Sequence, residues 1–253
     1  MIDIRSRADV EGMRAAGRAA ARVLAELRPL VVAGATTADL DAAAARLMAV
    51  HGCASACHGY VVGKLTYPGH ICISVNDEIV HGIGRADRVI RPGDVVSLDV
   101  VVRKDGFVGD NAHTVLVEPV PEPVRRLCAA TEASLQAGIS VVRPGGRVGD
   151  ISAAIAAAIQ PHGYGIVREF VGHGVGRKMH EEPQIPNWGT KGTGPKLVPG
   201  MALAIEPMIT LGSPRIVMDA DGWTARTKDG QPAAHYEHTV LVTEEGVEVL
   251  TRI

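Results

Sequence analysis

Two aspartates lie on neighbouring apolar runs in residues 95–117, VVSLDVVVRKDGFVGDNAHTVLV. Asp99 is in the first run, Asp110 is in the second, and a polar loop at residues 104–106 that ends in Gly is typical of a β-hairpin. A three-residue loop would place Asp99 opposite Asp110 to within one residue. Two carboxylates that face each other among valines repel and lose hydration, so a bound cation is the simplest remedy. The alternative is a pair of solvated carboxylates on an edge hairpin.

Segments of the first half of the chain recur in the second half. The matching pairs are Asp39-Leu40 with Asp150-Ile151, His51-Gly52 with His162-Gly163, residues 91–99 with 198–206, and HTVLV at 113–117 with HTVLV at 238–242. The matches keep the same order in both halves, which favours duplication over chance. We therefore predict an α+β fold of two related halves, each with a pair of helices and antiparallel strands.

Helix signals support this architecture. Apolar residues at helical spacing predict helices over residues 7–28 and 122–142, and a second helix that ends at His51-Gly52. Ser6 with Asp9, and Thr36 with Asp39, resemble the capping boxes that begin helices. Residues 53–70 are predicted to form a loop before a short strand at 71–75.

The duplication gives both hairpin aspartates a counterpart. Asp99 matches Glu206, and Asp110 has a near match in Glu237 on the same strand face, so we expect four carboxylates to converge on one centre. His173 lies between two glycines in GHGVGRKMHEEP; it is either an added imidazole donor or a turn histidine bonded to backbone. Four oxygen donors and one imidazole suit a pair of small divalent ions. Such a pair, roughly 3.5–4 Å apart, activates water and suits amide hydrolysis.

Composition is that of a soluble globular protein of 253 residues, 46% hydrophobic and 21% charged, with a formal net charge of −2. This charge predicts no nucleic-acid or membrane partner, and no apolar run approaches a membrane span. The first residues carry charges where a signal peptide needs an apolar run, so we expect a cytoplasmic protein, a monomer with one domain over residues 1–253. The four cysteines (Cys53, Cys57, Cys72 and Cys128) are expected to be free thiols.

Taken together, the motifs resemble the type I methionine aminopeptidases. The matching segments keep the family order over nearly the whole chain: SVNDEIVHGIG, SLDVVVRKDGFVGDNA, GHGVGRKMHEEP, PGMALAIEPM and DGWTARTKDGQPAAHYEHTVLVT. The resemblance implies the pita-bread fold, with two pseudo-symmetric halves around a central dinuclear metal site. It also implies removal of the initiator methionine from nascent polypeptides when the second residue is small. Two divalent ions (Co, Mn, Fe, Zn or Ni) would be the cofactors.

The resemblance implies a metal role for five residues. The ligands would be Asp99, Asp110, His173, Glu206 and Glu237. Asp110 and Glu237 would bridge the two ions, and Asp99 and His173 would each bind one ion. Glu206 would also act as the general base.

Catalytic and substrate contacts are also implied. His180 would donate to the scissile carbonyl oxygen, and His81 would contact the substrate backbone on the amide-nitrogen side. The methionine pocket would be formed by Tyr67, Cys72, Met179 and Trp223. Cys72 as a buried strand residue and Trp223 as a hairpin packing residue are the alternatives.

Two features depart from the family pattern. Met179 stands where the bacterial enzymes usually have Phe, and a flexible thioether can replace ring contacts. The segment between Cys57 and Tyr67 is several residues longer than the family pattern, which leaves the pocket roles of Cys57 and Tyr60 open.

Two other functions are alternatives on this fold. Proline-specific and creatinase-type peptidases carry a large extra N-terminal domain, for which the chain has no room. A non-catalytic relative that acts through RNA or the ribosome would lack metal ligands, and no basic run suggests an RNA surface. We expect nascent polypeptide N-termini as partners, leave transient ribosome contact open, and expect no docking through a zinc-binding or Pro-rich N-terminal extension.

Overall fold

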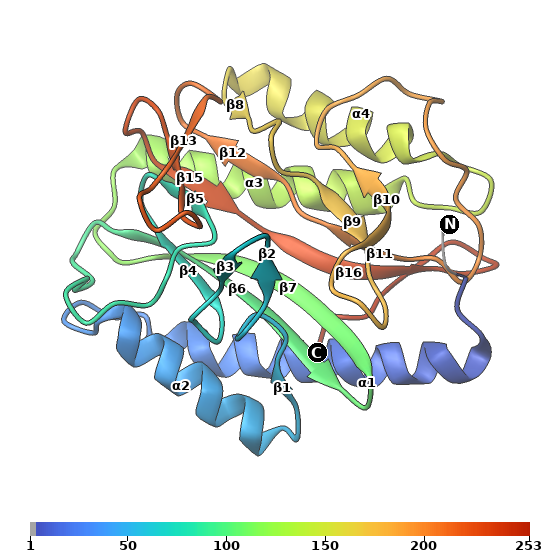
Figure 1. Ribbon diagram of the computed structural model, residues 1–253. Coiled ribbons are helices and arrows are strands. Elements are labelled where there is room, and N and C mark those ends of the chain that lie inside the picture. The colour runs from blue at the N-terminus through green and yellow to red at the C-terminus, as the bar shows by residue number, and fades with distance from the viewer. Residues whose placement is uncertain (1–3) are drawn as a thin grey trace.

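Two helix pairs pack against a central sheet in the computed structural model, which describes residues 4–253 (Figure 1). The first pair is α1 (Arg7–Leu27) and α2 (Thr37–Val50), and the second is α3 (Glu122–Ser140) and α4 (Val148–Ile159). Short 3₁₀ turns at Arg28–Leu30 and Gln160–His162 follow α1 and α4. Among the described residues, no helix combines the length and apolar character needed to cross a membrane.

Side chains cap the starts of α1 and α2 as predicted. The Ser6 hydroxyl accepts from the Asp9 N–H at 3.2 Å, and the Asp9 carboxylate accepts from the Ser6 N–H at 3.2 Å. Thr36 and Asp39 make the same pair of bonds before α2, at 2.9 and 3.1 Å. Asp150, the match of Asp39 in the second half, accepts from the N–H of the residue before α4 at 2.8 Å. These bonds satisfy N–H groups that a helix start leaves open.

The central sheet has nine strands, in the order β1-β6-β7-β16-β11-β9-β10, with β4 also on β6 and β17 also on β16. Its strands are β1 (Ala54–Ser55), β4 (Cys72–Val75), β6 (Val95–Lys104), β7 (Phe107–Leu116), β9 (Gly172–Gly174), β10 (Glu181–Ile185), β11 (Ala202–Ile205), β16 (Glu237–Val242) and β17 (Val247–Val249). One smaller sheet contains β8 (Gly165–Ile166), β12 (Met208–Thr210) and β15 (Ala233–His235). A second contains β5 (Glu78–Val80), β13 (Ile216–Met218) and β14 (Ala225–Thr227). A third pairs β2 (Val61–Val62) with β3 (Leu65–Thr66).

The β6–β7 hairpin turns more tightly than predicted. Lys104 pairs with Phe107, so only Asp105 and Gly106 form the loop. Both have positive φ, 50° and 81°. Positive φ at both positions defines the turn that suits two-residue hairpins, which is why the chain prefers this loop over three residues.

The shorter loop changes the cross-strand partners of the two aspartates. Asp99 pairs with Ala112, and Asp110 pairs with Val101. The prediction that the aspartates lie opposite each other is therefore wrong. They are diagonal neighbours on one face of the hairpin, still close enough to interact.

Residues 53–70, predicted as a loop, contain three strands of two residues each. β1 joins the edge of the central sheet, while β2 and β3 form a separate small hairpin. Two residues are too few to show an alternating pattern, so periodicity could not reveal these strands.

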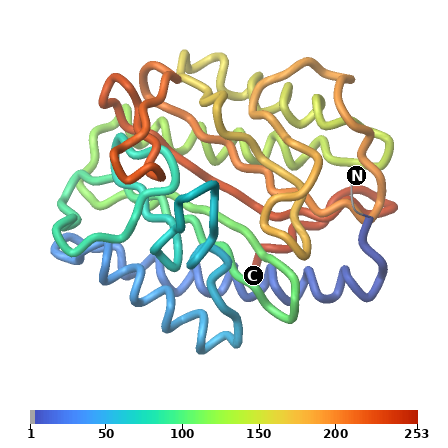
Figure 2. Tube along the Cα trace, in the orientation of Figure 1, coloured from blue at the N-terminus to red at the C-terminus, as the bar shows by residue number. Residues whose placement is uncertain are grey.

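Each half packs around its own apolar core, which confirms the predicted two-part organisation. The first core includes Leu24, Leu40, Ile73 and Leu98, and the second includes Leu127, Ile151, Leu203 and Val240. Figure 2 shows the blue-to-green half and the yellow-to-red half lying side by side. The halves meet where β7 pairs with β16, so a site at this junction draws residues from both.

Candidate active site

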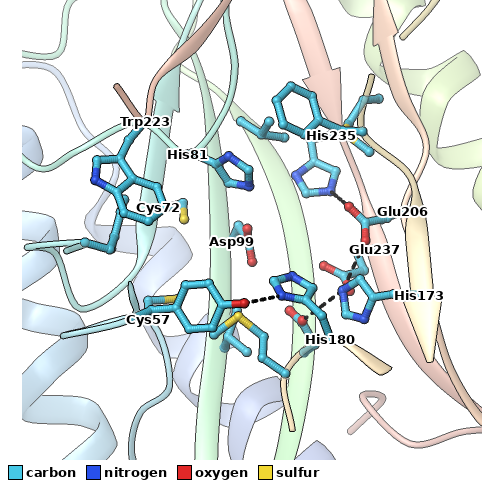
Figure 3. A pocket seen from close by; sticks show the side chains of 18 of the residues that line it. Cys57, Cys72, His81, Asp99, His173, His180, Glu206, Trp223, His235 and Glu237 are labelled. Carbon is cyan, nitrogen blue, oxygen red and sulfur yellow. Dashed lines mark hydrogen bonds and ion pairs between the residues drawn. The ribbon is translucent and has the colours of Figure 1, made fainter. Parts of the chain in front are cut away.

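A cavity of about 310 Å³ opens where the two halves meet (Figure 3). One wall is polar and carries the four predicted carboxylates with His173. The opposite wall is apolar and contains the residues predicted for the methionine pocket. Asp99 stands on β6, Asp110 on β7 and Glu237 at the start of β16, while Glu206 directly follows β11.

The sheet register explains why the carboxylates meet. Asp99 and Glu237 both pair with Ala112, so the three residues form one row across β6, β7 and β16. Residues in one row of a sheet project on the same side. The predicted convergence is therefore produced by strand pairing across the junction between the halves.

Burial and mutual repulsion make the carboxylates hard to ionise. Burial raises the pKa of Asp99 to about 7. Burial, followed by repulsion from the other carboxylates, raises the pKa of Asp110, Glu206 and Glu237 well above the usual range. One carboxylate oxygen of Asp99, of Asp110 and of Glu237 is buried without a hydrogen-bond partner. Such a cluster needs a cation.

The His173 ring presents Nε2 to the carboxylate cluster. Its Nδ1–H donates to the Gly174 carbonyl oxygen at 2.9 Å, which leaves a lone pair on Nε2. Nε2 lies 3.4 Å from Glu206 Oε1 and 3.8 Å from Asp110 Oδ2. Burial lowers the pKa of His173 to about 3, so the ring is neutral at physiological pH. One ligand atom each from Asp110, His173 and Glu237 lies within 4.8 Å of the others. This donor set fits small divalent ions.

Two more histidines stand between the polar and apolar walls (Figure 3). His180 Nδ1 lies 2.9 Å from the Tyr60 hydroxyl. The His81 ring meets the Phe170 ring edge-on, with centroids 5.1 Å apart, and His81 has a positive φ of 61°. Burial lowers the pKa of His81 to about 4 and also lowers that of His180. Both rings are therefore neutral hydrogen-bonding groups at physiological pH.

The apolar wall contains all four residues predicted for the methionine pocket, Tyr67, Cys72, Met179 and Trp223. The Tyr67 ring meets the Trp223 ring edge-on at 5.2 Å, and the Tyr67 hydroxyl donates to the Gly82 carbonyl oxygen at 2.7 Å. Cys57 and Tyr60, whose pocket roles were open, line the same cavity. All four cysteines are free thiols, as expected.

His235 is a further residue of the site, not predicted from the sequence. This residue lines the cavity and is 2% exposed. Its Nε2 lies 3.8 Å from Glu206 Oε2 and has no hydrogen-bond partner (Figure 3). A signal was present, because His235 precedes Glu237 by two residues and alternate residues of an extended chain share a face.

The sequence of the chain matches that of a known enzyme family. Residues 11–244 match metallopeptidase family M24. The chain is 44% identical over 244 residues to methionine aminopeptidase B of Synechocystis, which covers 96% of the chain and 89% of that relative. It is 42% identical over 241 residues to methionine aminopeptidase 1 of Bacillus subtilis, covering 95% of each.

Solved structures agree with the sequence comparison. The crystal structure of methionine aminopeptidase from Thermotoga maritima has a TM-score of 0.96 and 42% identity and covers 100% of both chains. A prolidase from Pyrococcus furiosus, at 21% identity and a TM-score of 0.78, shares the fold with 99% of this chain and 65% of its own. The pita-bread fold predicted from the sequence is thereby confirmed. The chain belongs to metallopeptidase family M24 and, within it, to the methionine aminopeptidases.

Proposed function

We propose that this chain removes the N-terminal methionine from new polypeptides when the second residue is small, with two divalent ions as cofactors. The observation that carries the proposal is the division of one cavity into two walls. Buried carboxylates and a neutral imidazole face an apolar pocket, and His81 and His180 stand between them.

Five residues would hold the ions: Asp99, Asp110, His173, Glu206 and Glu237. Asp110 and Glu237 come from neighbouring central strands of different halves, so both halves would contribute ligands. The oxygen-rich donor set is compatible with Co, Mn, Fe, Zn or Ni. When bound, such ions lower the pKa of water and polarise a carbonyl group.

Glu206 is the proposed general base. Its side chain stands at the border of the carboxylate cluster, between the His173 and His235 rings. Its backbone carbonyl oxygen accepts from Asn187 Nδ2 at 3.0 Å, which fixes the start of the side chain. From this position Glu206 takes the proton of the attacking water and passes it to the leaving amine.

His180 is the proposed donor to the scissile carbonyl oxygen. If the Tyr60 hydroxyl donates to Nδ1, the ring proton lies on Nε2 and is available to the substrate. This hydrogen bond strengthens as charge develops on the oxygen, so it lowers the barrier more than it improves ground-state binding. His81 would contact the substrate backbone on the amide-nitrogen side.

Substrate selection follows from the two sides of the scissile bond. The methionine side chain enters the pocket of Tyr67, Cys72, Met179 and Trp223. The next side chain then lies near His81, where a bulky group would displace the carbonyl from its catalytic contacts. We propose that the monomer acts on nascent polypeptides in the cytoplasm.

Replacing Glu206 with Gln tests the assignment of the base. Gln keeps the size and shape of Glu but carries no charge and cannot accept the proton. We expect turnover of a Met-Ala peptide to fall by about 100-fold or more, with circular dichroism unchanged. Glu245→Gln, at an exposed position, is the matched control. Wild-type turnover of Glu206→Gln would show that another residue is the base.

A further inference from the structure

The β2–β3 hairpin places exposed aliphatic side chains at the mouth of the cavity. Val61, Val62 and Leu65 are 59%, 52% and 41% exposed. Val62 also lines the cavity itself. This hairpin lies within the segment between Cys57 and Tyr67 whose length departs from the family pattern, and the function proposed above assigns it no role.

The hairpin is fixed to the site at both of its ends. The N–H of Tyr67 donates to the carbonyl oxygen of Tyr60 at 2.8 Å, which closes the base of the hairpin. The Tyr60 hydroxyl reaches His180 Nδ1 at 2.9 Å, and the Tyr67 hydroxyl donates to the Gly82 carbonyl oxygen at 2.7 Å. The exposed side chains are therefore held beside the reacting groups.

Leu65 extends the apolar surface across the mouth. It lies against Gly222, where an added Cβ would be 2.8 Å from Leu65 Cδ1. Gly222 precedes Trp223 of the methionine pocket. The apolar rim is thus continuous with the wall that holds the first substrate side chain.

We propose that this hairpin is a docking surface for the substrate polypeptide beyond the cleaved bond, and that it favours apolar residues at the third and fourth positions. The proposal rests on the aminopeptidase function. With the first peptide bond at the metal site, an extended chain advances roughly 3.3 Å per residue, so these residues leave the cavity past its mouth. Covering Val61, Val62 or Leu65 with an apolar side chain removes both surfaces from water.

Paired peptides test the proposal. Met-Ala-Leu-Leu-Gly and Met-Ala-Ser-Ser-Gly have the same length and the same first two residues. We expect the wild-type protein to have a kcat/KM about 5-fold higher for the Leu peptide than for the Ser peptide, through a lower KM. Partial burial of a few methyl groups gives a difference of this size. The variant Val61→Thr/Val62→Thr/Leu65→Thr should reduce this preference to less than about 2-fold. Thr keeps the β-branching of the two valines while a hydroxyl replaces a methyl group, and at position 65 it replaces the apolar end of Leu.

A control variant shows whether the change in peptide preference is specific to the β2–β3 hairpin. Val50→Thr, at a position 75% exposed at the end of α2, should keep the wild-type preference. Val62→Thr alone replaces the triple variant if the latter does not fold. The docking proposal is overturned if the preference is absent in the wild-type protein or unchanged in the variants, as it would be if the hairpin served another protein. Failure of every variant and of the wild type to cleave either peptide would instead refute the aminopeptidase function.

His235 carries a second, independent inference. The two carboxylate oxygens of Glu206 face different imidazoles: Oε1 lies 3.4 Å from His173 Nε2, and Oε2 lies 3.8 Å from His235 Nε2. His235 Nε2 is buried and has no hydrogen-bond partner. Thr114 Oγ1 accepts from the His235 N–H at 2.9 Å and donates to its carbonyl oxygen at 2.8 Å, which locks the backbone.

The geometry points to His235 as a positioning residue for Glu206. In the active enzyme the Nε2–H of His235 donates to Glu206 Oε2, so that Oε1 is turned toward the metal ligands. Hydrogen bonds at catalytic sites are often long before the substrate complex forms, which accounts for the separation of 3.8 Å. Substitution of a residue that orients a metal-binding carboxylate commonly lowers metal affinity or activity by about 10- to 100-fold.

Two variants test this role, since Gln retains an N–H donor and Leu does not. His235→Leu should lower kcat by about 10-fold or more and weaken Mn²⁺ binding to the chelator-treated protein, measured by calorimetry. His235→Gln should recover most of both losses. Equal losses in the two variants, or wild-type behaviour of His235→Leu, would overturn the proposal. Thermal unfolding of each variant without metal shows whether a loss reflects folding alone.

Discussion

Replacing Asp99 by Asn should stabilise the metal-free protein at neutral pH and weaken its binding of divalent ions. Burial raises the pKa of Asp99 from 3.8 to about 7. Because this folded-state pKa lies above that of the unfolded chain, the folded state retains a proton that the unfolded chain has lost. Stability therefore falls as the pH rises from about 4 to about 7, and the loss is complete above pH 7.

The size of the effect follows from the same shift. Between pH 5 and pH 7 the wild-type protein loses about 1.4 kcal/mol per pH unit through this group, and Asn has no proton to lose. The stability advantage of Asp99→Asn over the wild type should therefore grow by about 2–3 kcal/mol between pH 5 and pH 8. With metal present, Asp99→Asn should be less stable than the wild type, because the variant lacks one metal ligand.

Urea unfolding in the presence of a chelator measures this advantage at pH 5 and pH 8. Asp87→Asn is the matched control, since the Asp87 side chain is 81% exposed. Calorimetry with Mn²⁺ checks the loss of binding. If Asp99→Asn has the same stability relative to the wild type at both pH values, the carboxylate cluster is not a strained, cation-requiring site.

Three further substitutions probe other parts of the account. His180→Ala should lower kcat by about 100-fold with little change in KM, whereas a rise in KM alone would make His180 a simple binding residue. Tyr60→Phe should lower kcat several-fold in the same assay without changing thermal stability, and an unchanged kcat would remove Tyr60 from the orientation of His180. Gly109→Ala should destabilise the fold by about 2 kcal/mol or more in urea unfolding, since an added Cβ would lie 2.4 Å from the Ala16 carbonyl oxygen of α1. Wild-type stability of that variant would contradict the packing of α1 on β7.

Local signals with a strict chemical cause could be predicted from the sequence. Ser6 with Asp9 and Thr36 with Asp39 begin helices because their side chains satisfy open N–H groups, wherever the helix later packs. The duplication can be recognised because matched residues make the same contacts in both halves. Asp39 and Asp150 each accept a hydrogen bond from the backbone N–H of the residue before α2 and α4.

Features that depend on tertiary packing could not be predicted in the same way. The apolar pattern of the β6–β7 hairpin agrees with a loop of two residues as well as with the predicted loop of three, and only the positive φ of Asp105 and Gly106 distinguishes them. The β2–β3 hairpin has strands of two residues, too short for any period. For His235 the sequence offers only its spacing of two residues from Glu237, since a histidine on a strand does not by itself show that it is buried beside Glu206.

The most direct test of the central claim is the cleavage of Met-Ala-Gly-Gly, Met-Leu-Gly-Gly and Leu-Ala-Gly-Gly at one fixed Mn²⁺ concentration, before and after chelation. We expect release of methionine from the first peptide at least about 100-fold faster than cleavage of the other two, because a bulky second residue displaces the carbonyl from its contacts and the pocket is fitted to methionine. Chelation should abolish the activity, and added Mn²⁺ should restore it. Equal cleavage of the Met-Ala and Met-Leu peptides, efficient release of leucine, or full activity in chelator would contradict the account.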